Sequence, residues 1–517
     1  MLGEKDYKEK LYLSFSLSHK VHEDNFYRRL KRVLDLQFTR DMARPCYGKE
    51  GQKSIDPTVF FRLMLIGYLE NIISDRQLME HVGMRMDLLY FIDYDIDEPL
   101  PWHSTISRTR KLLPDAIFEE AFERVLGMCV ASGMVSGQTQ AIDSANIKAN
   151  ASLDSLEVKI PAQTLKEHIR EIKHLNDQQD DNPRRKAKRD RSNEDQRTIK
   201  SSKRQLRDLF THQQWFKNRE CGPLGSGNPC SRYLSNKTHY SPVDPDSRIA
   251  VKPGKLRQLY YLSNISVDTA HHVITHIQAN YADGKDSLNL IDVIRRTRRR
   301  LKRHHLKMDT VLADTGFSNG ENYKYLEENK ITACIPVHGQ YEGTRDGFVY
   351  EPELDRWRCS QGKYALFKRI KYQKNHPEKH YRTTRSDCKG CPLASGCIGK
   401  SHEKHIRMTL YKEYYDRAVI RGQLQKAKYY KKLRQSTVEP VFGTLINYTG
   451  MRKINTRGIE SANKVMLMAA MAYNLKKLIR YEIRRGQRLA KDCIALGTKL
   501  TDLLHLFFLN FKLKIST

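Results

Sequence analysis

The sequence lacks any long hydrophobic stretch, and its first residues form no apolar segment. No run approaches the roughly 20 consecutive apolar residues that a membrane-spanning helix needs, and the apolar run at residues 503–511 (LLHLFFLNF) is too short. The first ten residues, MLGEKDYKEK, are charged and do not resemble the apolar core of a secretory signal. We therefore expect a cytoplasmic protein with no membrane partner.

The chain of 517 residues has no dense cysteine pattern, and it has fewer acidic than basic residues. The ten cysteines do not form the dense pattern of a small disulfide-rich secreted domain, so we expect a reducing compartment. The 60 Asp and Glu residues are outnumbered by 91 Lys and Arg residues, which gives a formal net charge of +31. Because this excess is spread through the chain, it indicates a polyanionic partner, with nucleic acid as the first candidate.

The length predicts several domains, and the first, residues 1–135, is predicted to be helical. Its apolar residues recur at helical spacing, and Asp56-Pro57 and Ser74 are typical helix starts. The stretch HSTISRTRKLLP, residues 103–114, carries Arg108 and Arg110 as candidate DNA contacts. A solvated helix face explains the same pattern equally well.

The remainder of the chain predicts a mixed α/β fold. Residues 136–337 alternate strand-like and helical runs, beginning with QTQAID and IKANAS, which suit a hairpin, and they are interrupted by a charged insertion at about 155–220. Residues 338–410 hold short strand-like pieces and cysteines. Long helical stretches are expected from 411 to 439 and from 461 to 484 within a C-terminal part spanning 411–484, and a tail follows at 485–517.

Three acidic residues are candidates for metal-dependent phosphodiester chemistry. Asp143 follows the strand-like QTQAI, Asp314 follows VLA before a turn, and Glu439 lies in the helical segment RQSTVEPVFG. Two divalent cations about 4 Å apart stabilise the attacking and leaving oxygens, and carboxylates are the ligands that such hard cations prefer. Each acid alone is more often a turn residue or a helix cap, and only tertiary folding can bring the three together.

Three phrases containing these acids resemble the signature regions of DDE transposases from bacterial insertion sequences. They are AIDSANIKANAS, VLADTGFSNGENYKYLEENKI, and the long block that begins STVEPVFG and continues to AMAYNLKKL. The segments GKEGQKSIDPTVFFRLMLIGYL and PWHSTISRTR are similar to the N-terminal domain of these enzymes. The resemblance extends from about residue 48 to about residue 480, and the blocks occur in the family order.

The resemblance implies an RNase H-like catalytic core, a helical N-terminal domain, and an insertion before the last acidic residue. It implies that Asp143, Asp314 and Glu439 are catalytic and bind Mg²⁺ or Mn²⁺. The implied partners are double-stranded DNA, as element ends and target, and a second copy of the chain in a homodimer on DNA. We therefore expect the protein to be associated with the nucleoid in the cytoplasm.

Several basic residues near these blocks are candidate DNA contacts. Four would neutralise the DNA backbone, with an ordinary surface charge as the alternative for each: Lys148, Lys252, Lys255 and Arg457. Arg434 would contact a phosphate or position its helix. Many relatives have a lysine seven or eight residues after the glutamate, where this chain has Ile446 and Asn447. Arg452 or Lys453 can supply that phosphate contact instead.

Four cysteines are a candidate structural Zn²⁺ site. Cys388, Cys391 and Cys397 lie in SDCKGCPLASGC, and Cys359 precedes them. Four thiolates complete a tetrahedral zinc shell and would hold together a segment with little core. Free thiols and an iron–sulfur cluster are the alternatives.

Two other functions fit the same residues. A metal-dependent DNA endonuclease without strand transfer would use the same carboxylates. A non-catalytic DNA-binding protein derived from a transposase is the third interpretation, but such a protein is expected to have lost an acid, and all three remain.

Overall fold

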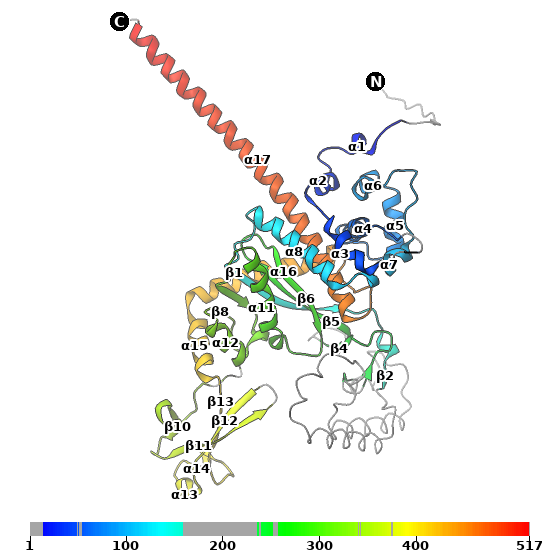
Figure 1. The fold of residues 1–517 in the computed structure, drawn as a ribbon. Coiled ribbons are helices and arrows are strands. Elements are labelled where there is room, and N and C mark those ends of the chain that lie inside the picture. Colours follow the sequence, from blue (N-terminus) through cyan, green and yellow to red (C-terminus); the bar gives the residue numbers. More distant parts are fainter. Residues whose placement is uncertain are drawn as a thin grey trace, which may run out of the picture.

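The computed structural model describes residues 14–48, 50, 54–158, 235–236, 239–251, 257–339, 341, 343–373 and 376–515. Side chains are described as far as 487, except at residues 158, 373 and 376. Nearly all of the predicted insertion at 155–220 lies outside this part of the chain, as do Lys252 and Lys255. The described part comprises helices at the N-terminal end, a six-stranded mixed sheet, a separate five-stranded sheet, and long C-terminal helices (Figure 1).

The N-terminal region is helical, as predicted. Its elements are α1 (Leu17–Lys20), α2 (Phe26–Val33), α3 (Phe38–Ala43), η1 (Arg44–Cys46), α4 (Pro57–Leu69), α5 (Asp75–Gly83), α6 (Met86–Ile92), α7 (His103–Leu112) and α8 (Asp115–Ala131). Asp56 caps α4 by accepting a hydrogen bond from the Thr58 amide at 2.8 Å, and Ser74 caps α5. Every residue of α4 after Pro57 is buried, so α4 is the central helix of this region.

The mixed sheet has the strand order β4-β5-β1-β7-β8, with β6 also paired to β5. Its strands are β1 (Thr139–Lys148), β4 (Arg248–Ala250), β5 (Gln258–Asp268), β6 (Ile274–Tyr281), β7 (Thr310–Ala313) and β8 (Thr332–Cys334). Strands β1, β7 and β8 are parallel, whereas β4 and β6 pair antiparallel to β5 and β5 pairs antiparallel to β1. A short pair, β2 (Glu157–Val158) and β3 (His239–Tyr240), lies apart from this sheet.

The prediction of a hairpin within residues 138–152 is wrong. β1 is one continuous strand that pairs with β5 from Gln140 to Lys148 without a shift in register. Asp143 therefore lies in the middle of a strand rather than at its end. The long partner strand β5 favours extension over a turn, because each further residue of β1 gains a paired neighbour.

The helices that follow β6 are α11 (Leu290–Arg303), α12 (Gly320–Glu328), α15 (Lys412–Gln423), α16 (Gln425–Tyr448) and α17 (Ile459–Ile515). The helix expected from 411 to 439 is divided at Leu424, whose backbone is extended. α17 continues beyond the expected end at 484 through the predicted tail, and its C-terminal half projects away from the other elements (Figure 1). In the part of the chain that the structure describes, no helix is long and apolar enough to cross a membrane.

α17 protects the exposed edge of the mixed sheet. The Asn474 side chain accepts a hydrogen bond from the Ile274 amide at 3.0 Å and donates one to the Ile274 carbonyl at 2.9 Å. Asn463 accepts a further bond from the Ala279 amide. Backbone groups of the edge strand β6 are thus satisfied by side chains, which removes an edge available for pairing with another chain.

One hydrophobic core joins the N-terminal helices, the mixed sheet and α17. Phe118 of α8, Ile277 of β6 and Met468 of α17 all belong to it. The buried Lys464 of α17 also donates to the Leu113 carbonyl at 2.8 Å, just beyond the C-terminal end of α7. The N-terminal helices are therefore packed onto the body that carries the candidate acids.

The five-stranded sheet has a small core of its own. Strands β9 (Phe348–Glu351), β10 (Arg356–Cys359), β11 (Tyr364–Gln373), β12 (His376–Arg382) and β13 (His405–Thr409) pair antiparallel in chain order, and short helices α13 (Arg385–Cys388) and α14 (Ala394–Cys397) lie between β12 and β13. Six residues, including Trp357 and Tyr381, form the core. The predicted fold class, a mixed α/β, RNase H-like core with a helical N-terminal region and an insertion before Glu439, is confirmed.

Candidate active site

Asp143 and Asp314 occupy neighbouring positions where β7 ends alongside β1. The last paired residues of the two strands are Ile142 and Ala313; Asp143 is the next residue of β1, and Asp314 directly follows the end of β7. Neighbouring strands are about 4.8 Å apart, and residues in register point to the same face. The two carboxylates are therefore brought together by the sheet, although the sequence separates them widely.

Arg434 of α16 contacts both carboxylates. Its Nη1 lies 3.0 Å from Asp143 Oδ2, and its Nη2 lies 3.8 Å from Asp314 Oδ1. The Arg434 side chain is only 11% exposed, whereas Asp314 is 56% exposed. The two aspartates thus converge on one cationic group and keep an open side towards solvent, which fits a pair of ligands for a hard divalent cation.

The packing of α16 explains how Arg434 is aimed. Thr437, Val438, Val441, Phe442 and Leu445 form its buried stripe. This stripe holds the helix against β1, β7 and β8, and Arg434 lies on the same side one turn earlier. The guanidinium is therefore positioned by an apolar contact that does not itself involve charge.

The described structure does not gather Glu439 and the two aspartates into a group that could hold a metal ion. Five helical residues place Glu439 about 140° around α16 from Arg434, and the Glu439 side chain is exposed. Within the described residues, no three His, Cys, Asp or Glu side chains are arranged to hold a metal ion. Pro440, inside the helix, lacks the amide that would bond to residue 436, so the backbone is less constrained at Glu439 than elsewhere in α16.

A groove with basic walls lies at the far end of β1. β7 leaves β1 after Ile142, and beyond that point Lys148 forms an isolated bridge with Lys453. The groove has a volume of about 610 Å³ and is also lined by Arg257. Five extended residues separate Asp143 from Lys148, which corresponds to about 17 Å.

The groove brings together residues that sequence reasoning treated separately. Lys148 and Lys453 were candidate phosphate contacts, and both are exposed. Arg257 was not proposed, because the sequence around it is an ordinary strand start with no distinguishing motif. Arg457 is exposed but does not line this groove.

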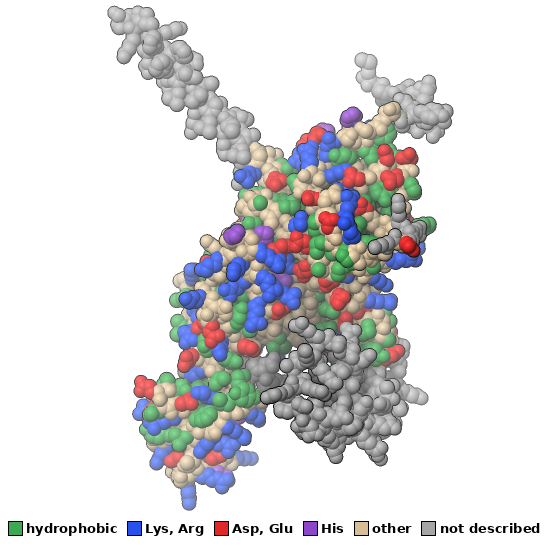
Figure 2. Space-filling model, viewed as in Figure 1, with side chains coloured by type: hydrophobic (Ala, Val, Ile, Leu, Met, Phe, Trp, Pro, Cys, Tyr) green, Lys and Arg blue, Asp and Glu red, His purple; other side chains and the backbone are tan. Residues whose placement is uncertain are grey.

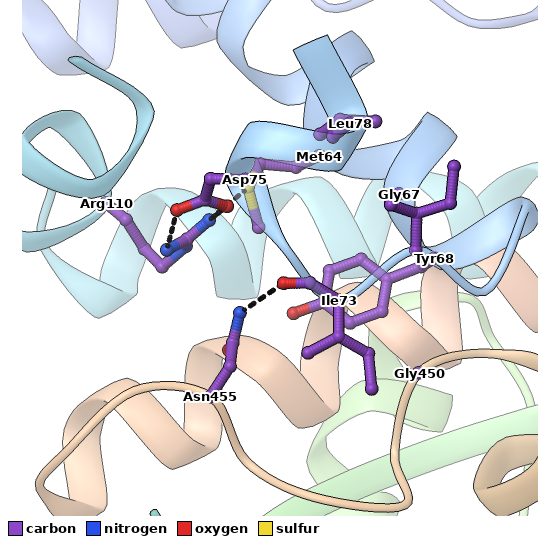
Figure 3. Close-up of a pocket in the computed structure, with 10 residues that line it drawn as sticks. Met64, Gly67, Tyr68, Ile73, Asp75, Leu78, Arg110, Gly450 and Asn455 are labelled. Atoms are coloured by element: carbon purple, nitrogen blue, oxygen red, sulfur yellow. Dashed lines mark hydrogen bonds and ion pairs between the residues drawn. The ribbon is translucent and has the colours of Figure 1, made fainter. Parts of the chain in front are cut away.

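The prediction that Arg110 contacts DNA is wrong. Arg110 is 5% exposed, and its two terminal nitrogens lie 2.6 and 3.1 Å from the carboxylate oxygens of Asp75 (Figure 3). Arg108, two residues earlier on α7, is exposed and stays a candidate. The helix rotates by about 200° over two residues, so one arginine faces solvent while the other faces α4 and α5.

The cavity beside Arg110 is too small for a substrate. Its volume is about 20 Å³, and it lies between α4, α5 and the loop at 449–458 (Figure 3). A space of this size holds about one water molecule. We therefore assign it to the packing of the loop onto the N-terminal helices.

This loop links the candidate site to the N-terminal helices. The Gly450 amide donates to Asn71 Oδ1 at 2.9 Å, and the Asn455 side chain donates to the Ile73 carbonyl at 2.9 Å. Gly450 has a φ of 73°, and a Cβ there would lie 3.2 Å from the Tyr68 ring. The end of α16 is therefore fixed to the end of α4 by a turn that requires glycine.

The four cysteines at 359, 388, 391 and 397 do not form a metal-binding group in the described structure. Cys359 and Cys397 instead pack against the small core of the five-stranded sheet. The Cys388 thiol lies 3.1 Å from the Thr383 hydroxyl. The zinc site stays a prediction, and metal analysis of the purified protein, with unfolding measured before and after chelation, tests it.

Comparisons with known families match two regions of the chain. Residues 15–112 are similar to the family described as Transposase domain (DUF772), and residues 358–479 are similar to the family described as Transposase DDE domain. The second match includes Arg434 and Glu439, whereas Asp143 and Asp314 lie outside both matches. A sequence comparison with curated proteins gives no match.

Proposed function

We propose that this chain, two regions of which match transposase families, is a DDE transposase of an insertion sequence that cleaves the ends of its element and joins the freed 3′-hydroxyls to target DNA. The adjacent carboxylates of Asp143 and Asp314 carry this proposal, because they lie side by side where β7 ends alongside β1, in a chain with two regions that match transposase domains. A homodimer on DNA would allow two element ends to be processed together.

The proposed cofactor is Mg²⁺ or Mn²⁺. Asp143 and Asp314 would hold it, and Glu439 would complete the set of carboxylates after moving towards them at the turn that contains Pro440. The bound cations stabilise charge on the attacking and leaving oxygens of the phosphodiester. Asp314, which is the more exposed aspartate, lies on the side open to DNA.

Arg434 has two proposed roles in this site. Without DNA, it holds the two aspartates close together, because one guanidinium contacts both. With DNA present, a phosphate offers the same planar guanidinium an alternative partner. Arg434 would then position the substrate strand beside the carboxylates.

Glu439→Gln tests whether the third acid belongs to the site. The variant is expected to lose metal-dependent nicking of DNA that carries the flanking element ends, because it removes one carboxylate ligand without changing size. Glu413→Gln, at an exposed position of α15, is the matched control and is expected to keep full activity. Equal nicking by Glu439→Gln and the wild type would remove Glu439 from the proposed site.

Transfer of a labelled 3′-end into plasmid DNA separates transposition from simple cleavage. The proposed function predicts joined products that depend on Asp314. Nicking without any joined product would favour the endonuclease interpretation, whose metal site is the same.

The groove at Lys148 and Lys453 is proposed to bind the DNA backbone about five base pairs from the reacting phosphodiester, given its distance of about 17 Å from Asp143. Lys148→Ala and Lys453→Ala are each expected to weaken binding of all duplexes alike. Each is also expected to reduce the slope of log affinity against log salt by about 0.9.

Fluorescence anisotropy at several salt concentrations measures this slope. Lys20→Ala, an exposed lysine at the end of α1, removes the same charge elsewhere and is the control. An unchanged slope for both groove variants would exclude the groove as a DNA contact.

A further inference from the structure

The five-stranded sheet carries a row of basic side chains across three of its strands. Arg369 of β11 lies opposite His380 of β12, and His380 lies opposite Arg407 of β13. In the adjacent row, Arg382 lies opposite His405. Residues in register share a face of the sheet, so these five side chains form one surface, which we call the cationic face.

Acidic side chains do not balance the cationic face. Arg369 and Arg407 are exposed, and neither forms an ion pair with any residue whose position the structure describes. Arg382 is paired with Glu403 at 3.0 Å, and Glu378 approaches His380 to 3.7 Å. Figure 2 shows Lys and Arg side chains gathered over the lobe that contains this sheet.

Packing of the sheet does not require the exposed cations of this face. The core of the sheet, with Trp357 and Tyr381, lies on the other face. Burial lowers the pKa of His380; Glu378 opposes this shift, and Arg369, Lys371 and Arg407 add to it. The charges on this face that have no ion-pair partner among the described residues are therefore those of Arg369 and Arg407, one on each side of His380. Exposed cations that packing does not use are available to a polyanionic partner.

β11 also carries exposed apolar side chains, which lie opposite Tyr381, Lys379 and Pro377 and are therefore on the other face from the cations. Phe367 is 42% exposed, Ile370 is 36% exposed and Tyr372 is 75% exposed. The register between β11 and β12 shifts between Phe367 and Arg369, which marks a bulge in the strand. Bulges change the direction of side chains and are common beside binding sites.

We propose that the cationic face binds the phosphate backbone of duplex DNA, with Arg369 and Arg407 as its main contacts. This inference rests on the proposed function, which supplies DNA as the polyanion, and it gives the inserted sheet a role other than structural support. The exposed basic row, in which Arg369 and Arg407 have no acidic partner among the described residues, favours nucleic acid.

The test combines a DNA-binding measurement with a stability measurement on the full chain. The double variant Arg369→Ala/Arg407→Ala is expected to bind a labelled duplex of arbitrary sequence more weakly. Its slope of log affinity against log salt should fall by about 1.8, which corresponds to two lost phosphate contacts. The thermal midpoint of the same variant should stay close to that of the wild type, because both side chains are exposed and lie outside the core of the sheet.

The double variant Arg299→Ala/Lys302→Ala is the matched control. Both residues are exposed on α11, which packs on β5 and β6 of the other sheet, so the control removes the same net charge elsewhere. A smaller loss of salt dependence in the control supports a local contact. An equal loss of salt dependence in both double variants would show that DNA binding responds only to net charge, and this would overturn the proposal.

The remaining outcomes are also decisive. A lower thermal midpoint with unchanged DNA affinity would show that the two arginines are structural. If the wild type cleaves element ends while the double variant binds DNA normally, the inference fails and the proposed function stands. If no form of the protein cleaves DNA but the salt dependence falls as expected, the inference stands and the proposed function fails.

Discussion

Asp143→Asn is expected to abolish DNA cleavage while DNA binding is retained. The amide has nearly the same size as the carboxylate but lacks the charge that a hard cation requires. Metal-dependent stabilisation of the transition state is worth several kcal/mol, so we expect a loss of at least about 10³-fold in rate. Nicking of end-labelled element DNA in Mg²⁺ measures the rate, and anisotropy measures binding in parallel.

The same substitution changes the contacts of Arg434. In the Asp143→Asn variant, Asp314, at 3.8 Å, would be the remaining carboxylate that Arg434 contacts in the described site. The unfolding midpoint should therefore be recorded with the activity, so that loss of the fold is distinguished from loss of the ligand. Asp309→Asn, just before the first residue of β7, removes one carboxylate outside the site and is expected to cleave normally. Full cleavage by Asp143→Asn would remove Asp143 from the mechanism.

Arg110→Ala is expected to lower the free energy of unfolding by about 3–5 kcal/mol, because it leaves a partly buried charge without its partner. Asp75 is 19% exposed and loses the bidentate contact made by the two Arg110 nitrogens. Removal of the Arg110 stem also enlarges the small cavity where the loop at 449–458 meets the N-terminal helices. Urea unfolding followed by circular dichroism measures the change.

Arg108→Ala is the matched control, since it removes the same side chain two residues earlier on the same helix. Its exposed position predicts a change in unfolding free energy within about 0.5 kcal/mol. If Arg108 contacts DNA, this variant loses affinity without losing stability. Equal stability of the Arg110→Ala protein and the wild type would contradict the structural role assigned to Arg110.

Local chemistry explains which elements were predictable. Asp56-Pro57 and Ser74 start helices because their side chains satisfy free amides, which depends only on adjacent residues. The hairpin prediction failed because a strand of ten residues with polar positions resembles two short strands until its partner is known. β5 supplied that partner from more than a hundred residues away.

The candidate sites also combine features that adjacent residues predict with features that only packing decides. The candidate acids were recognised from the phrases around them, and the two arginines of α7 were indistinguishable there. Packing then made Arg110 a buried ion-pair partner and left Arg108 exposed. Arg257 was missed because only the fold places it beside Lys148 and Lys453.

The sequence by itself determined the charge, the fold class, and the residue types available for metal-dependent DNA chemistry. Those properties depend on composition and on short patterns, which each segment carries alone. The tertiary structure alone decided that Asp143 and Asp314 are neighbours, that Arg434 contacts both, and that the described residues do not gather Glu439 with them into a group that could hold a metal ion. Strand register and helix packing set those distances, and both are fixed by contacts between segments far apart in the chain.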